Sequence, residues 1–157
     1  MAYPINALVE GVLTPPIAEA WSWVEGRDFP TNRPLIDVCQ AVPGYPPDAS
    51  LARHLAERVL LPETARYTDI PGIPPLREAL AADIRARYGG ACQAGDIVIT
   101  AGCNQAFFST MIALAGAGDE VILPLPYYFN HEMTLAGLGI RAVPLACDSD
   151  AGAVPRA

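Results

Sequence analysis

The chain contains no lysine: all of its 10 basic residues are arginines, and its formal net charge is −7. A P-loop of the G-x-x-x-x-G-K-[ST] type requires a lysine, so this phosphate-binding motif is excluded. No arginine cluster is present that could follow a nucleic-acid backbone, and an acidic protein repels polyanions. Nucleic acid is therefore not an expected partner.

Cysteine and histidine are scarce, and their spacing excludes the usual metal and disulfide patterns. The 4 cysteines lie far apart without a C-x-x-C pair, and neither of the 2 histidines stands at metal-ligand spacing. We therefore expect free thiols and no metal site. The cysteines are Cys39, Cys92, Cys103 and Cys147.

Long apolar runs are also missing. The longest, Ala106–Gly118, is interrupted by Ser109 and Thr110 and is too short to span a bilayer. The beginning of the chain lacks the basic region and apolar core of a secretory signal peptide. These absences predict a cytoplasmic protein without a membrane segment, and 157 residues suit a single domain.

The first two of three predicted parts of the chain are an arm and a helical lead-in. Residues 1–34 form a proline-rich N-terminal arm with one short helix from Pro16 to Val24. Residues 35–95 contain a rigid loop over 41–47 and a helix that begins after Asp48 and ends before Pro62. A third helix over 74–88 begins at two prolines and ends at a glycine pair.

The two lead-in helices have apolar residues at helical spacing. An Asp83–Arg87 pair is expected on the exposed side of the second. Its predicted buried stripe is Leu76, Leu80, Ile84 and Tyr88, and that of the first is Leu51, Leu55 and Val59.

The third part, residues 96–157, has a strand–helix–strand–helix–strand rhythm. Apolar strands are predicted over 97–100, 120–123 and 140–145, with helices over 104–115 and 129–138. This order predicts an α/β fold with a partial parallel or mixed sheet, flanking helices and right-handed crossovers. Such a sheet needs cover on both faces, and these strands alone leave it incomplete.

Two segments of this third part could carry chemistry. The turn around Gly102 leads from a strand into a helix, whose first amides have no intrahelical partner and can bind a phosphate. Taken alone, an ordinary strand-to-helix turn explains it better, and the G-x-G-x-x-G dinucleotide motif is absent. The aromatic residues Tyr127, Tyr128 and Phe129 follow the next strand, where they form either a packed cluster or a surface for a flat heterocycle.

Three ordered motifs resemble those of class I/II pyridoxal-phosphate-dependent aminotransferases. The first is the run Tyr67–Leu80, similar to the "G-x-x-x-L-R-x-A" stretch of that family. Ile99–Ala106 resembles its phosphate-binding turn, and Gly118–Tyr128 its "G-D-E-V-x-x-P-x-P-x-[WY]" segment. The resemblance covers roughly residues 30–147 and implies the amino-terminal portion of a fold type I enzyme.

The resemblance implies a site for pyridoxal 5'-phosphate. Gly102, Cys103 and Asn104 would hold the phosphate, mainly through the amides of the last two, and Tyr128 would stack on the pyridine ring. Tyr67 would reach the phosphate bound in a neighbouring subunit, which implies a homodimer with shared active sites.

The resemblance also implies transamination between an amino acid and a 2-oxo acid. Ala41 and Val42 lie in the loop on the substrate side, where the family often has glycine at the position of Ala41. The Schiff-base lysine, the aspartate beside the ring nitrogen and the carboxylate-binding arginines lie downstream in the family. No catalytic residue is therefore expected within these 157 residues, and the chain alone is expected to be inactive.

Other interpretations stay open at this point. A C–S lyase or a synthase of the same fold shares these motifs and differs mainly in its pocket. An aminotransferase-like regulatory domain or a non-catalytic fragment that folds poorly are further alternatives.

Overall fold

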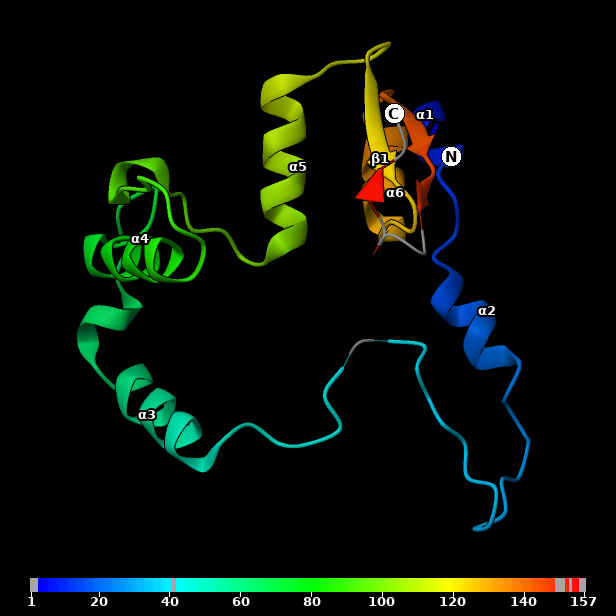
Figure 1. Ribbon diagram of the computed structural model, residues 1–157, viewed down its shortest axis with the longest axis horizontal. Helices are drawn as coiled ribbons and strands as arrows, with labels where there is room; N and C mark the ends of the chain where they lie inside the picture. Colours follow the sequence, from blue (N-terminus) through cyan, green and yellow to red (C-terminus); the bar gives the residue numbers. More distant parts are fainter. Residues whose placement is uncertain (1–2, 41, 149–151, 153, 156–157) are drawn as a thin grey trace. The chain divides into compact units, whose positions relative to one another are not determined.

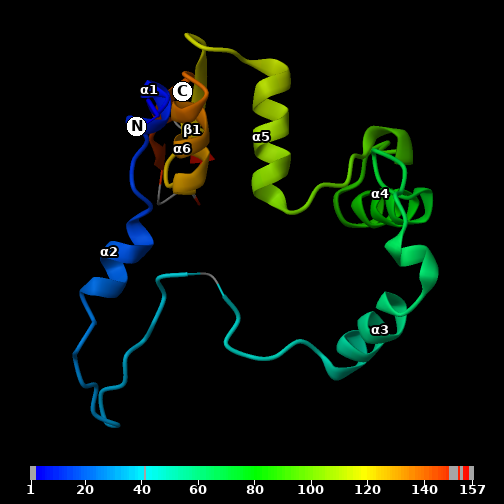
Figure 2. The same ribbon diagram turned by 180° about the vertical axis from the view of Figure 1, so that it is seen from behind.

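The computed structural model describes residues 3–40, 42–148, 152 and 154–155. By its internal contacts the chain divides into two compact units (Figure 1; Figure 2). The first unit comprises Met1–Gly26 together with Ala101–Ala157, and the second comprises Arg27–Thr100. The three-part division at residues 34 and 95 stays a prediction.

A parallel strand pair forms the centre of the first unit. Strands β1 (Glu120–Pro124) and β2 (Arg141–Leu145) pair in register, and helix α6 (Phe129–Gly137) connects them. The core between helix and strands consists of Leu123, Leu135 and Ile140, all buried. This β–α–β arrangement confirms the α/β fold class and most of the rhythm that the sequence predicted.

Helix α5 (Cys103–Leu114) packs on this core through Phe107 and Met111. The arm adds α1 (Ala7–Glu10), which contacts α6, and α2 (Pro16–Ser22). The sequence predicted the helix beginning at Pro16 but not α1. Helix α1 forms because the side chain of Asn6 accepts a hydrogen bond from the Leu8 amide, at 3.0 Å.

The end of the chain adds a short antiparallel ribbon of β3 (Cys147–Asp148) and β4 (Val154–Pro155). The sequence gives no periodic signal there, because strands this short cannot show one.

Within the described residues, no helix is long and apolar enough to cross a membrane.

The second unit contains helices and connecting loops. Helix α3 (Ala49–Val59) is capped by Asp48, which accepts a hydrogen bond from the Ser50 amide at 2.8 Å. The 3₁₀ turns η1 (Pro62–Ala65) and η2 (Ala94–Asp96) flank α4 (Pro74–Tyr88). The side chain of Arg77 ties α4 to both neighbouring loops, donating to the carbonyls of Gly72 at 2.9 Å and Ala94 at 3.0 Å.

The predicted buried stripe of α4 is wrong. Its buried residue is Ala81, whereas Leu76 is 46% and Tyr88 82% exposed. Helix α4 contacts η2, the neighbouring 3₁₀ turn. The Asp83–Arg87 pair is confirmed, at 2.8 Å.

The predicted strand at Ile97–Thr100 is not formed among the described residues. Ile97 is extended, with φ −114° and ψ 130°, and the Ile99 amide donates to the carbonyl of Pro71 at 2.9 Å. Beside that bond, Gly72 has a φ of 98°, and a Cβ built on it would lie 2.5 Å from Cγ1 of Ile99. The extended segment thus packs on the loop before α4, while the β1–β2 pair forms elsewhere in the chain.

Candidate functional site

The turn that begins α5 has a backbone conformation that requires glycine. Gly102 has φ 91° and ψ 169°, a region that residues with a Cβ almost never occupy. Around it, the side chain of Gln105 accepts a hydrogen bond from the Ala101 amide at 2.5 Å, and the Ala106 amide donates to the Gly102 carbonyl at 3.3 Å. Hydrogen bonds to residues of the first turn of α5 therefore stabilise this turn.

The amides of Cys103 and Asn104 point out of the first turn of α5. In the part of the chain that the structure describes, no protein group accepts a hydrogen bond from either amide. Both residues are exposed, and they stand at the positive end of a helix of 12 residues. This donor set fits a phosphate, which such helix ends bind through their backbone amides.

Tyr128 stands at the N-cap of α6, directly after β1 and the loop that follows it. Its side chain is 48% exposed, and its ring lies 4.8 Å from the ring of Phe129, tilted by 60°. Its hydroxyl oxygen accepts a hydrogen bond from Nδ2 of Asn130, at 2.7 Å. A ring held in this way can offer an exposed part of its surface to a flat heterocycle.

His131 connects Tyr128 to α5. Its ring stacks on that of Phe107, with centroids 4.1 Å apart and planes at 22°, and it meets Tyr128 edge-on at 5.7 Å. Phe107 lies one helical turn after Cys103, so one aromatic network joins the start of α5 to the start of α6. Taken singly, neither Asn130 nor His131 stood out in the sequence; their position within one turn of Tyr128 was the available signal.

Tyr127 faces the core on the other side of the same segment. Its hydroxyl donates to Oε2 of Glu132 at 2.8 Å, and this hydrogen bond raises the pKa of Tyr127 above its usual range. The first turn of α6 therefore fastens both tyrosines, Tyr127 through Glu132 and Tyr128 through Asn130.

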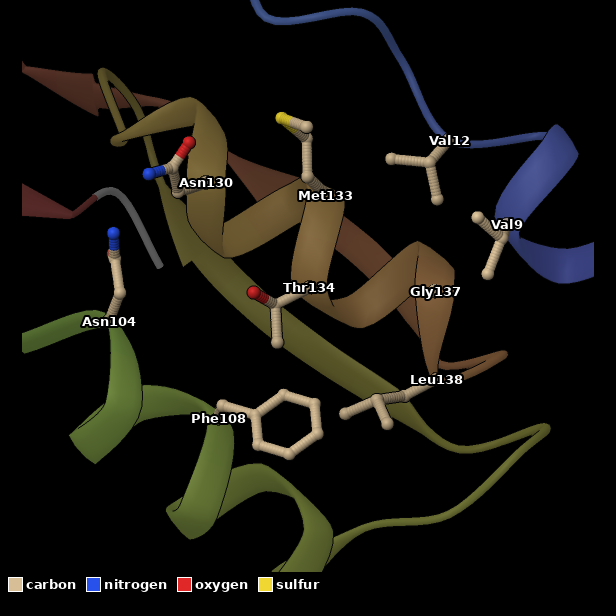
Figure 3. A pocket seen from close by; sticks show the side chains of 9 residues that line it. All are labelled: Val9, Val12, Asn104, Phe108, Asn130, Met133, Thr134, Gly137 and Leu138. Atoms are coloured by element: carbon tan, nitrogen blue, oxygen red, sulfur yellow. The ribbon is translucent and has the colours of Figure 1, made fainter.

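A hollow of ≈ 400 Å³ lies between the arm, α5 and α6. Figure 3 shows the amide side chains of Asn104 and Asn130 at one end of it and Val9 of the arm at the other. The rest of the lining is mainly apolar: Val12, Phe108, Met133, Thr134, Gly137 and Leu138. The polar end of the hollow thus adjoins the turn at Cys103 and the start of α6.

The predicted site residues are divided between the two units. Gly102, Cys103, Asn104 and Tyr128 all belong to the first unit. Tyr67 and Val42 belong to the second, both with exposed side chains, and Tyr67 borders a small hollow that also includes Arg66.

Ala41 lies outside the described residues, so its predicted role on the substrate side has no structural description. The amide of the next residue, Val42, donates to the carbonyl of Gln40 at 2.8 Å. Both residues of this bond belong to the predicted substrate-side loop.

Residues 33–154 match the family model described as aminotransferase class I and II. The chain is 29% identical over 121 residues to an aspartate aminotransferase of Streptomyces avermitilis, covering 77% of this chain and 30% of that protein. It is 30% identical over 135 residues to the aspartate/prephenate aminotransferase of Thermus thermophilus, covering 84% of this chain and 35% of that protein.

A crystal structure of an aminotransferase from Escherichia coli has the same fold. It superposes with a TM-score of 0.78 at 20% identity, over 99% of this chain and 39% of that one. The chain therefore spans roughly a third of the length of the proteins it matches.

Proposed function

Because this chain belongs to the aminotransferase class I and II family, we propose that it supplies the phosphate seat and the stacking ring of a pyridoxal 5'-phosphate-dependent amino-acid aminotransferase. The reaction would move an amino group between an amino acid and a 2-oxo acid. The observation that carries the proposal is the pair of amides at Cys103 and Asn104, for which the described residues contain no acceptor, in the same unit as the exposed ring of Tyr128.

The predicted site residues of the first unit each have a defined part in this proposal. Gly102 turns the backbone so that the amides of Cys103 and Asn104 donate to phosphate oxygens, at the positive end of α5. Tyr128 stacks on the ring and fixes its plane. When bound, the cofactor supplies an electron-withdrawing ring that the side chains of proteins lack.

The second unit contributes on the substrate side and between subunits. In our proposal Tyr67 donates its hydroxyl to the phosphate held by a second copy of the protein, so the working enzyme is a homodimer. The loop containing Ala41 and Val42 borders the amino-acid substrate. The exposed positions of Tyr67 and Val42 are consistent with these roles.

The chain has no lysine, so it has no side-chain amine that could hold the cofactor covalently or carry the proton at the substrate α-carbon. In our proposal that lysine belongs to a part of the protein outside these 157 residues. The chain alone then binds the cofactor without turnover.

Binding can be measured without any covalent chemistry. Pyridoxamine 5'-phosphate, which has no aldehyde, is titrated into the purified chain and its fluorescence is followed. We expect it to bind at least about tenfold more tightly than pyridoxamine, because charge-assisted bonds to the phosphate are lost in the latter. Equal affinity for the two compounds, or no binding of either, contradicts the proposed phosphate seat.

Substitutions at two separate glycines provide the matched variants for this titration. Gly102→Ala forces a side chain into a left-handed conformation that costs about 1–3 kcal/mol, so we expect roughly tenfold weaker binding of pyridoxamine 5'-phosphate. Gly95→Ala is the control, because a Cβ there meets nothing within 4 Å and the backbone needs no glycine. Transamination catalysed by the purified chain alone would contradict the assignment of the amine to residues outside it.

A further inference from the structure

We infer that Asn130 is a positioning residue for Tyr128: its side-chain amide holds the hydroxyl of Tyr128 and thereby sets the plane of the ring on which the cofactor stacks. The inference rests on the proposed function, because it concerns the ring assigned there to the pyridine. Asn130 lies outside the three motifs on which the family resemblance rests.

The hydrogen bond fixes the far end of the Tyr128 side chain. Nδ2 of Asn130 donates to the hydroxyl oxygen at 2.7 Å, a short and well-formed bond. Among the described residues, the ring also has aromatic contacts, with Phe129 at 4.8 Å and His131 at 5.7 Å. A side chain that is 48% exposed has few other contacts to restrict its rotamer.

The direction of the bond matters for binding. Because Asn130 donates, the phenolic proton of Tyr128 remains available to an acceptor on a ligand. In the described part of the chain, no protein group accepts this proton. The bond therefore orients the ring without using the phenolic proton.

Preorganisation explains why such a bond affects affinity. A flexible ring must be ordered when a ligand stacks on it, and that loss of freedom weakens binding. A ring already held by Asn130 has lost this freedom before the ligand arrives. Asn130 suits the task because it is the second residue of α6, and its short side chain reaches back to the N-cap residue.

The first experiment detects the bond itself and needs no ligand. The chain is labelled with tyrosine that carries ¹³C at the ring carbon bonded to oxygen, and the signal of Tyr128 is assigned by its loss in Tyr128→Phe. We expect Asn130→Ala to shift this signal. Thr134→Ala, one helical turn further along α6 and lining the same hollow, is the control and should leave it in place. An unchanged Tyr128 signal in Asn130→Ala overturns the inference.

The second experiment is a double-mutant cycle on the binding of pyridoxamine 5'-phosphate. We expect Asn130→Ala and Tyr128→Phe each to weaken binding roughly fivefold, the worth of one hydrogen bond. The double variant should be no weaker than Tyr128→Phe alone, because both changes remove the same bond. Thr134→Ala should bind like the native chain.

The outcomes separate this inference from the function on which it rests. Native affinity in Asn130→Ala, or additive losses in the double variant, contradicts the positioning role and leaves the proposed function standing. Absence of binding in the native chain contradicts the proposed function, and the positioning role fails with it. Far-ultraviolet circular dichroism of each variant shows that α6 is intact, which is expected because alanine favours helix.

Discussion

Helices α6 and α3 differ in how far the rest of their unit covers their apolar side chains. In the first unit, α6 lies on the β1–β2 pair, and Leu135 is 0% exposed. In the second unit, Leu51 of α3 is 50% exposed and Leu55 58%, although the helix is amphipathic and well capped. A periodic apolar stripe is thus necessary for a core but not sufficient, because the core also needs a partner surface within the same unit.

The same contrast applies to the candidate site. The seat assigned to the phosphate and the ring of Tyr128 stands on helices that pack on a core of their own, in the first unit. Tyr67 and Val42, which are assigned to a neighbouring subunit and to the substrate, lie in exposed segments of the second unit. Parts of the proposed site that act within one unit are preformed, and parts that act on something else are exposed.

The strongest test of the contrast removes one leucine from each helix. Leu135→Ala should lower the free energy of unfolding by about 2–5 kcal/mol, because it opens a cavity in a closed core. Leu55→Ala should change it by less than about 1 kcal/mol, because that side chain is already largely in water. Urea unfolding followed by far-ultraviolet circular dichroism measures both. Equal losses would show that α3 is covered to the same extent as α6.

A smaller effect is expected from the cap of α3. Asp48→Ala removes the acceptor for the hydroxyl and the amide of Ser50, and these two hydrogen bonds hold the pKa of Asp48 below its usual range. We expect amide hydrogen exchange in the first turn of α3 to become roughly fivefold faster, with α6 unaffected.

The acid dependence of that cap follows from the sign of the shift. A carboxyl group with a lowered folded-state pKa stabilises the helix above its unfolded pKa, and this stabilisation is lost as the pH falls through the folded value. The protection factors of the first-turn amides in native α3, which correct for the pH dependence of intrinsic exchange, should therefore fall below about pH 4, and those of the variant should not follow that trend. A pH response unchanged by Asp48→Ala would contradict the capping role.

The smallest effect is expected at high pH in the first unit. The pKa of Tyr127 is raised by its hydrogen bond to Glu132, so its contribution is complete below the unfolded pKa of tyrosine and is lost as the pH rises through the folded value. The melting temperature of the native chain should fall more steeply above about pH 10 than that of Tyr127→Phe. Tyr45→Phe, at an exposed tyrosine of the second unit, is the control.

The local elements were predicted well from the sequence because their signals are local. Prolines and glycines bound α4, Asp48 caps α3, and short apolar runs mark β1 and β2. The wrong predictions concern features that depend on contacts with other parts of the chain. The segment 97–100 has the composition of a strand but packs on the loop at Pro71, and the buried residue of α4 is Ala81 and not a residue of the predicted stripe.

The candidate site was predictable where a motif specifies backbone geometry. Gly102 takes the glycine-only conformation that the turn requires, and the following amides have no protein acceptor in the described residues. The roles of Asn130 and His131 were not predictable, since each depends on a side-chain contact with a ring whose direction the sequence does not show.

Because Gly72 and Ile99 approach each other closely, the residues allowed at one position depend on the residue at the other. Any larger residue at 72 would collide with Ile99 and displace the backbone shortly before Gly102. A grafted or recombined version of this protein that takes the two loops from different parents should therefore fail at the junction more often than one that inherits them together.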